Sequence, residues 1–488
     1  MSTPVRRTVP PWAVIPAAIA ALVLVRLVMF RTYVGGDEAG FLMVSHHWHD
    51  GPSLYGSYWV DRPPLLLWLN ELAGGVTSLR ILGLAASVLT VLGAACAAQV
   101  ARGAAAARWA AGAAALFGGA QWLGIARVNG EMLAAPFVAW SIALTLHAVL
   151  RPSWRVPAAF GAGVLAVCAL SIKQSVIEAF VFALALGLAM VVQRRDTRPV
   201  VVRVLAWGVL GALLTLAAVL LGAEARGTSP SDLFDAVIRF RAEAGEVIRS
   251  SASDATPLRL LVMMGTWTVS GLGAATALTA WQGVRRKDPL LLATAATLLC
   301  SLVIALFGGS YWAHYLIQMV PAASLGIGLL AGQMPAHLMR RLAVATVTVT
   351  LANLVWAVGF EPDDNGQQHT IGTWLREARQ PGDTGVVTFG QANVLYEADL
   401  SSPYIYLWSL PVRTRDPHLR ELAAVIASPQ RPTWVVNWSG LNSWGIEPGR
   451  TEAVLRDGYR KVATICGRSI WLLTTQTRTL PVVPKVCP

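Results

Sequence analysis

Long apolar stretches recur along most of this 488-residue chain, and they restrict what it can fold into. A helix needs about 17–25 mostly apolar residues to cross the roughly 30 Å hydrocarbon core of a bilayer. Charged residues make up 14% of the chain, against about 25% in an average soluble domain. The sequence therefore predicts a polytopic α-helical membrane protein with about eleven transmembrane helices: 12–31, 79–101, 107–124, 132–150, 156–172, 175–193, 200–222, 258–284, 289–307, 315–333 and 341–359.

Positive charge follows every second apolar segment. Short cytoplasmic loops of membrane proteins are enriched in Lys and Arg, so this alternation predicts a cytoplasmic N-terminus and an outer C-terminal tail. The net charge of +12 then reflects membrane topology, and we expect no nucleic-acid partner. The basic residues are Arg6, Arg7, Arg102, Arg108, Arg151, Arg155, Arg194, Arg195, Arg198, Arg203, Arg285, Arg286, Lys287, Arg340 and Arg341.

The topology divides the chain into two parts. Residues 1–359 are predicted to form the transmembrane catalytic domain, with outer loops at 32–78 and 223–257. An amphipathic helix at the membrane surface is expected in each loop, with aromatic residues of the first loop at headgroup level; these are Trp48, Tyr55, Tyr58 and Trp59. Residues 360–488 have an ordinary globular composition and are predicted to form a small extracytoplasmic α/β domain.

In that tail, helix-like and strand-like patterns alternate. Helices are expected at 370–380, 417–428 and 452–459, and strands at 385–389, 433–438 and 469–474. Cys466 and Cys487 also lie there, where an oxidising environment permits a disulfide. We predict that they pair and fix the C-terminus; the alternative is two free thiols.

Polar residues gather near the predicted outer ends of the helices. Ionisable groups at such positions are costly unless they line a wet cavity, so they are candidates for function. Cations there can hold a phosphate through charge-assisted hydrogen bonds, and a carboxylate can accept a proton. The set comprises Asp37, Glu38, Asp61, Arg62, Arg127, Asn129, Glu131, Lys173, Gln174, Glu178, Tyr311, His314, Tyr315 and Gln318. His46 and His49 would share a helix face, but no nearby set of acids or cysteines completes a metal site.

The order of six short motifs resembles the GT-C superfamily of polyprenyl-phosphate-sugar glycosyltransferases. That superfamily includes bacterial relatives of protein O-mannosyltransferases and of the lipid A aminoarabinose transferase. The resemblance covers roughly residues 10–335, and the tail is similar to the extracytoplasmic domain of many bacterial members. The motifs are Asp37-Glu38, Asp61-Arg62-Pro63-Pro64-Leu65, 78–83, 126–132, 170–174, and Ala313-His314-Tyr315-Leu316 with Pro321.

The resemblance implies a role for each motif. Asp37 corresponds to the catalytic base or acceptor-site acid, and Glu131 stands where the family has a second acid. The donor phosphate would be bound by Arg62 and Lys173, with His314 and Tyr315 near the donor. Glu38, Asp61 and Gln174 would support them. The family often has Lys or His at the position of Arg62 and Asp at that of Glu131.

The implied reaction is a direct displacement with inversion at the anomeric carbon. The partners would be a polyprenyl-phosphate-linked sugar, an extracytoplasmic acceptor and the lipids of a bacterial plasma membrane. No metal or other cofactor is expected, because side-chain cations can stabilise the leaving phosphate. The sugar, the acceptor and the lipid length stay open.

The same residues also fit other interpretations. Asp37 could mark only the membrane boundary, Arg62 could pair only with Asp61, and Lys173 could extend towards the membrane surface. A transporter or flippase of lipid-linked sugars would show internal repeats with broken helices, and we find no such symmetry. A glycan ligase or polymerase would have a longer, cation-rich loop than 223–257.

Overall fold

The computed structural model of the chain describes residues 13–194, 197–250, 255–360, 363–443, 446 and 448–487. Arg6, Arg7 and Arg195, which contributed to the predicted topology, lie outside the described residues.

Within the described residues, seven helical segments are long and apolar enough to cross a membrane, or eight if a bent pair counts as one span. The bent pair, α12 (Ala255–Val269) and α13 (Leu272–Arg286), turns by 62°. The seven are α4 (Val76–Arg102), α6 (Gly130–Leu150), η3 (Pro152–Trp154) with α7 (Arg155–Leu170), α9 (Arg198–Glu224), α14 (Pro289–Phe307), η6 (Ala313–Met319) with α15 (Val320–Leu330), and α16 (Ala336–Gly359).

Ten of the eleven predicted spans each coincide with one helical segment, and the eleventh, 258–284, is divided between α12 and α13. Apart from the seven segments and the bent pair, three helices that coincide with predicted spans are only 15 or 16 residues long: α1 (Val14–Met29), α5 (Ala104–Gly118) and α8 (Glu178–Gln193). Their predicted outer ends belong instead to loops that carry polar residues. The sequence therefore located the helices but overestimated how many reach full membrane length.

Small residues set the spacing of these helices. Where α7 crosses α9, a Cβ on Gly163 would come within 1.8 Å of the Gly208 carbonyl oxygen, and a Cβ on Gly211 within 2.2 Å of the Phe160 carbonyl oxygen. Because lipid tails are as apolar as the helices, close backbone packing is a main source of helix association in a bilayer.

The first outer loop folds into α2 (Gly36–His46) and α3 (Pro64–Ala73), and three of the four aromatic residues predicted at headgroup level are not exposed at a surface. Trp48, Tyr55 and Tyr58 are almost fully buried. The Trp48 indole donates to the Thr228 hydroxyl at 2.9 Å, and the Tyr58 hydroxyl accepts from the Ser402 amide at 3.0 Å. The C-terminal segment therefore contacts Tyr58, whereas the second outer loop contacts Trp48, and sequence periodicity could not reveal either contact.

The second outer loop forms α10 (Pro230–Phe234), the short π-helix η5 (Asp235–Arg239) and α11 (Phe240–Ser250). The apolar residues of the predicted amphipathic helix do not share one environment. Phe234 and Ile238 are about half exposed, at 54% and 51%, whereas Phe240 is fully buried against Trp59. Only part of this loop thus presents apolar side chains outward.

The described part of residues 363–487 forms a four-stranded sheet with helices around it. Strand order is β1-β2-β4-β3, with β1 parallel to β2 and the other pairs antiparallel. The elements are α17 (Gly366–Ala378), β1 (Gly385–Val387), α18 (Ala392–Ala398), α19 (Ser409–Arg415), α20 (Arg420–Ala427), β2 (Trp434–Asn437), α21 (Thr451–Gly458), β3 (Tyr459–Ile465) and β4 (Arg468–Leu473). The predicted disulfide between Cys466 and Cys487 is formed.

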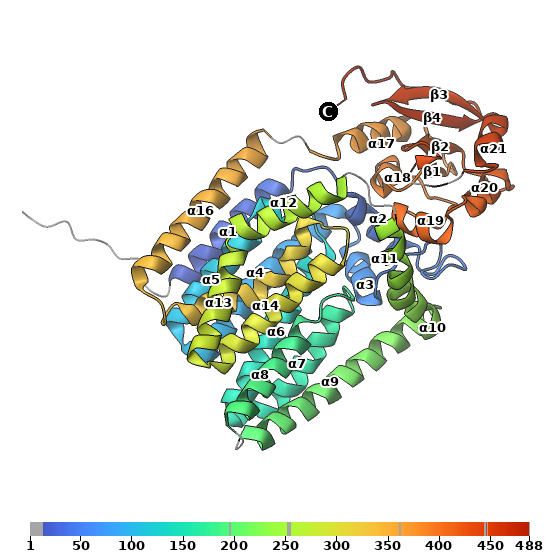
Figure 1. The fold of residues 1–488 in the computed structure, drawn as a ribbon. Coiled ribbons are helices and arrows are strands. Elements are labelled where there is room, and N and C mark those ends of the chain that lie inside the picture. The colour runs from blue at the N-terminus through green and yellow to red at the C-terminus, as the bar shows by residue number, and fades with distance from the viewer. Residues whose placement is uncertain are drawn as a thin grey trace, which may run out of the picture.

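Figure 1 shows this sheet region packed at the end of the helices where α2, α3 and α11 lie. Loops predicted to be cytoplasmic contact one another elsewhere. Arg102 pairs with Asp288, which also accepts a hydrogen bond from Gln333, and Arg286 donates to the Gln333 carbonyl. Loops of the same predicted side are thus grouped together.

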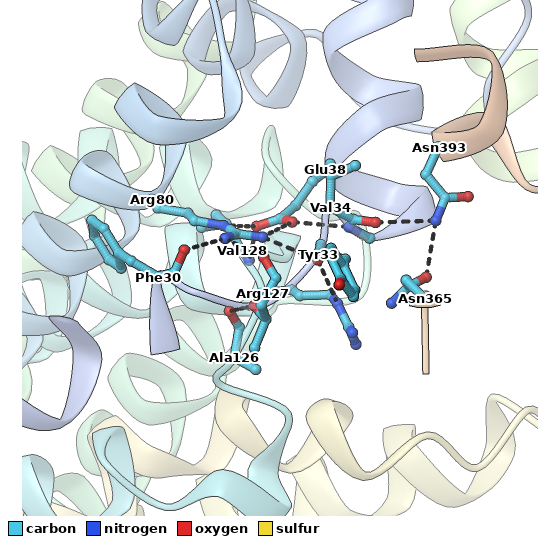
Figure 2. Close-up of polar contacts among 12 residues, drawn as sticks. Phe30, Tyr33, Val34, Glu38, Arg80, Ala126, Arg127, Val128, Asn365 and Asn393 are labelled. Carbon is cyan, nitrogen blue, oxygen red and sulfur yellow. Dashed lines mark hydrogen bonds and ion pairs between the residues drawn. The ribbon is translucent and has the colours of Figure 1, made fainter. Parts of the chain in front are cut away.

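A buried ion pair between Glu38 and Arg80 connects the elements at the end of the helices where the C-terminal sheet packs (Figure 2). Arg80 donates to the carbonyl oxygens of Phe30, Thr32 and Tyr33 as well as to Glu38. Glu38 also accepts from the amides of Gly35 and Val128, at 3.1 and 2.9 Å. The chain between α1 and α2 is therefore fixed to α4, and the start of α2 with it.

Arg80→Leu should destabilise the protein by about 3–5 kcal/mol, because it leaves the Glu38 carboxylate buried without its cation. The free energy of unfolding in detergent measures this. Arg376→Leu is the matched control, since Arg376 forms an exposed pair with Glu397 and should cost at most about 1 kcal/mol. Equal losses in the two variants would contradict the structural importance of the buried pair.

Candidate active site

Asp37 is the second residue of α2 and is only partly buried. Its Oδ1 atom accepts a hydrogen bond of 2.9 Å from the indole nitrogen of Trp408. A carboxylate at a helix N-terminus is favoured by the helix dipole. The side chain thus has one defined protein contact and is open enough to meet another molecule.

Arg62 lies just before α3, which begins with Pro64 at its first position. The neighbouring Asp61 is buried and pairs with two cations, Arg62 at 2.7 Å and Arg241 of α11 at 2.6 Å. Burial acts to lower the pKa of Arg62, but Asp61 and then Asp37 outweigh it, and the pKa is raised. Arg62 therefore stays charged. Gln174 donates to the Asp61 carbonyl at 2.9 Å, which ties this turn to the α7–α8 loop.

Glu131 and Lys173 form a buried ion pair. Glu131 is in the first turn of α6, where Asn129 caps the helix by accepting from the Met132 amide. Lys173 lies in the α7–α8 loop, with its Nζ 4.3 Å from the centre of the Tyr315 ring. Burial lowers the pKa of Lys173, and Glu131 opposes that shift.

His314 and Tyr315 complete this side of the cluster. His314 Nε2 lies 3.8 Å from Glu131 Oε1. The rings of His314 and Tyr315 meet edge to face, with their centroids 5.0 Å apart. Gly124 makes room for His314, because a Cβ at Gly124 would lie 3.0 Å from the His314 Cβ. The left-handed φ of +69° at that position also favours glycine.

The structure thus brings together candidate residues from five separate segments. The Arg62 guanidinium lies 5.8 Å from the centre of the Phe41 ring in α2, one turn after Asp37. Gln174, next to Lys173, donates to the Asp61 carbonyl, so Arg62 and Lys173 lie on adjoining segments. Asp37 also contributes to the raised pKa of Arg62. Lys173 does not extend towards the membrane surface, since its side chain is only 12% exposed and points to Glu131. Glu38 does not face this cluster; its carboxylate is held by Arg80.

Two residues of this neighbourhood were not predicted from the sequence. Arg241 is in the second outer loop, in no recognisable motif, and its contact with Asp61 depends on how α11 packs. Trp408 is in the C-terminal part, 371 residues from Asp37. An interfacial tryptophan carries no sequence signal that distinguishes it from a core residue.

An apolar cavity of about 640 Å³ lies elsewhere and does not coincide with these residues. It lies between α1, α5, α13, α15 and α16 and is lined mainly by apolar side chains such as Leu22, Phe117 and Leu354. It contains no candidate acid or base.

Among the described residues, no group of three or more His, Cys, Asp or Glu side chains is arranged to hold a metal ion. In the histidine-rich segment after α2, His47 pairs with Asp50 at 2.9 Å. The expected absence of a metal stays a prediction.

No protein-family model matches the chain, and no curated protein matches it. Solved structures do. ArnT from Cupriavidus metallidurans bound to undecaprenyl phosphate aligns over 94% of this chain and 97% of its own, with a TM-score of 0.64 and 14% identity. The Archaeoglobus fulgidus oligosaccharyltransferase, tethered to an acceptor peptide with the NVT sequon, aligns over 96% of this chain and 75% of its own, with a TM-score of 0.56 and 13% identity.

The chain has the GT-C fold. The archaeal enzyme AglB in complex with an inhibitory peptide and a dolichol-phosphate also aligns, over 87% of this chain and 69% of its own, with a TM-score of 0.53 and 15% identity. A further structure of the Archaeoglobus fulgidus enzyme contains zinc and sulfate. The predicted fold class, a polytopic membrane protein with a small C-terminal α/β region, is confirmed.

Glu131→Gln should cost about 3–5 kcal/mol of stability near neutral pH, because the Lys173 ammonium loses its buried counter-ion. The folded protein holds the Lys173 proton more weakly than the unfolded chain does. Without Glu131 that pKa falls further, so the variant gives up the buried proton at lower pH than the native protein does. The penalty relative to the native protein should therefore shrink as pH rises towards the lowered pKa that Lys173 has in the native protein.

Unfolding free energies between pH 7 and pH 10 test this relation. The double variant Glu131→Gln/Lys173→Met is the control, and its stability relative to the native protein should not recover with pH. A constant deficit for Glu131→Gln across the range would contradict the inferred coupling.

Proposed function

We propose that this protein is a membrane glycosyltransferase that moves a sugar from polyprenyl phosphate to an extracytoplasmic acceptor. The observation that carries the proposal is the placement of two cations, Arg62 and Lys173, in one neighbourhood with the partly exposed Asp37 carboxylate. The fold supports it, because ArnT was solved with undecaprenyl phosphate and AglB with a dolichol-phosphate.

Arg62 and Lys173 would bind the donor phosphate. Arg62 offers a planar fork of donors, and Lys173 a compact point charge, both of which suit phosphate oxygens. Asp61 and Glu131 keep these cations in place. Both cations are largely withdrawn from water, where their interaction with a developing negative charge is stronger.

Asp37 would act as the general base. The acceptor hydroxyl or amine gives its proton to Asp37 while its oxygen or nitrogen forms a bond to the anomeric carbon. The bond from that carbon to the phosphate oxygen breaks, and polyprenyl phosphate leaves with both bonding electrons. Attack opposite the leaving group inverts the anomeric configuration.

Three further candidates surround the donor site. Glu131 was predicted as a second acid, but its carboxylate is engaged by Lys173, which favours a role in orienting that cation. His314 and Tyr315 flank the same pair and would shape the wall around the sugar phosphate. We propose no metal or cofactor, since Arg62 and Lys173 can supply the charge that the leaving group needs.

We also propose how the protein lies in the membrane. The N-terminus is cytoplasmic, residues 1–359 form the catalytic membrane domain, and residues 360–488 form a domain outside a bacterial plasma membrane. The grouping of the basic loops around Asp288 supports this orientation, because Arg102 and Arg286 both contribute to it.

Asp37→Asn should lower sugar transfer by about 10²–10⁴-fold, because the amide cannot accept the proton of the acceptor. The assay follows consumption of polyprenyl-phosphate mannose and polyprenyl-phosphate arabinofuranose by the purified protein. Asp50→Asn is the matched control, since Asp50 is an exposed acid of the same loop. Native rates in Asp37→Asn would refute the assignment, and movement of intact donor across vesicles would favour a flippase.

Arg62→Leu and Lys173→Met should each weaken binding of undecaprenyl phosphate about 10- to 100-fold. A hydrogen bond to a charged group contributes about 1.5–3 kcal/mol, and about 1.4 kcal/mol corresponds to a tenfold change. Arg379→Leu is the control, because Arg379 pairs with Asp399 at the surface. Unchanged affinity in both site variants would place the phosphate elsewhere.

A further inference from the structure

The C-terminal domain reaches into the candidate site through Trp408. Its indole nitrogen donates to Asp37 Oδ1 at 2.9 Å, and its ring packs on Phe41 with centroids 5.2 Å apart. Gly40 allows this approach, because a Cβ there would lie 2.3 Å from the Trp408 Cζ2 atom. The missing side chain at Gly40 therefore leaves space on α2 for the Trp408 ring.

A second residue of the same domain holds the chain just before Asp37. Asn393, fully buried in α18, donates from Nδ2 to the Val34 carbonyl at 3.0 Å (Figure 2). Asn393 is in turn held next to Asn365. The first turn of α2 is therefore contacted by the C-terminal domain both at its backbone entry and at the Asp37 side chain.

The backbone that supports Trp408 is itself unusual. Phe389, Gly390 and Gln391 follow β1 with φ values of +62°, +115° and +65°. Two of the three are not glycine, and such conformations persist where the surrounding structure determines them. A Cβ on Gly390 would lie 3.5 Å from the Ser409 amide nitrogen, so this loop packs directly against the Trp408–Ser409 backbone.

We propose that the C-terminal domain is a working part of the catalytic centre and that Trp408 is a positioning residue for Asp37. This inference rests on the proposed function, in which Asp37 is the base. The indole N–H can only donate, so it occupies Oδ1 and leaves Oδ2 to take the acceptor proton.

The hydrogen bond also separates two opposite charges. Arg62 is close enough to Asp37 for the carboxylate to affect its pKa. A carboxylate free to rotate would turn towards this guanidinium, and the pair would then be lost both as base and as phosphate ligand. Trp408 holds Asp37 on the acceptor side, so that Asp37 does not compete with the donor phosphate for Arg62.

The test is Trp408→Phe, which keeps a ring on Phe41 but removes the N–H. We expect kcat for the polyprenyl-phosphate sugar that the native protein consumes to fall about 10- to 100-fold, as for a displaced catalytic group. KM for that donor and the affinity for undecaprenyl phosphate should not change. An altered KM with native kcat would overturn the inference.

Trp374→Phe is the matched control. It removes an indole N–H from the same domain, but one that donates to the Pro481 carbonyl at 3.1 Å and not to Asp37. We expect native kcat. A loss equal to that of Trp408→Phe would show that any weakening of the domain lowers activity, and it would overturn the positioning role.

Gly40→Ala perturbs the same contact from the membrane side. The added methyl group occupies the position of the Trp408 ring, while alanine remains well suited to a helix. We expect the same loss of kcat as in Trp408→Phe, and native kcat would overturn the inference. If Asp37→Asn is inactive while Trp408→Phe is fully active, this inference fails and the proposed function survives; if Asp37→Asn is active, the proposed function itself fails.

Discussion

The buried contact between Glu38 and Arg80 is the interaction on which the rest of the outer end depends. It brings the end of α1, the start of α2, the body of α4 and the loop before α6 to one point. Removing two charges from water costs free energy, and hydrogen bonds with five backbone groups around this pair offset part of that cost. Since Asp37 directly precedes Glu38, the same contact fixes where the candidate base can be.

The C-terminal domain adds further contacts at this end of the helices. Tyr33 and Arg127 meet Asp363 at the start of the domain, and Arg415 of α19 reaches Asp235 beside α11. Arg241, on α11, then reaches Asp61. Segments distant in sequence therefore define the candidate site jointly, and neither the membrane helices nor the C-terminal sheet supplies all of it.

Hydrophobicity was sufficient to locate the membrane helices, because burial in lipid leaves a long apolar stretch for each one. Hydrophobicity did not predict where Trp48, Tyr55 and Tyr58 lie, since aromatic residues are common both in buried cores and at lipid surfaces. Strand β3 and helices α18 and α19 were missed because their short segments lack clear start and stop signals. Motif order located Arg62 and Lys173, but Arg241 and Trp408 depend on tertiary contacts that no local pattern records.

The position of Asp61 between Arg62 and Arg241 has a further consequence. This carboxylate serves as a shared counter-ion, which offsets the repulsion between the two guanidinium groups. In the proposed reaction, an incoming lipid phosphate would compete for Arg62 with an anion that is already present. The same carboxylate would take the phosphate's place when the carrier leaves, so strong charges at the site need not slow product release.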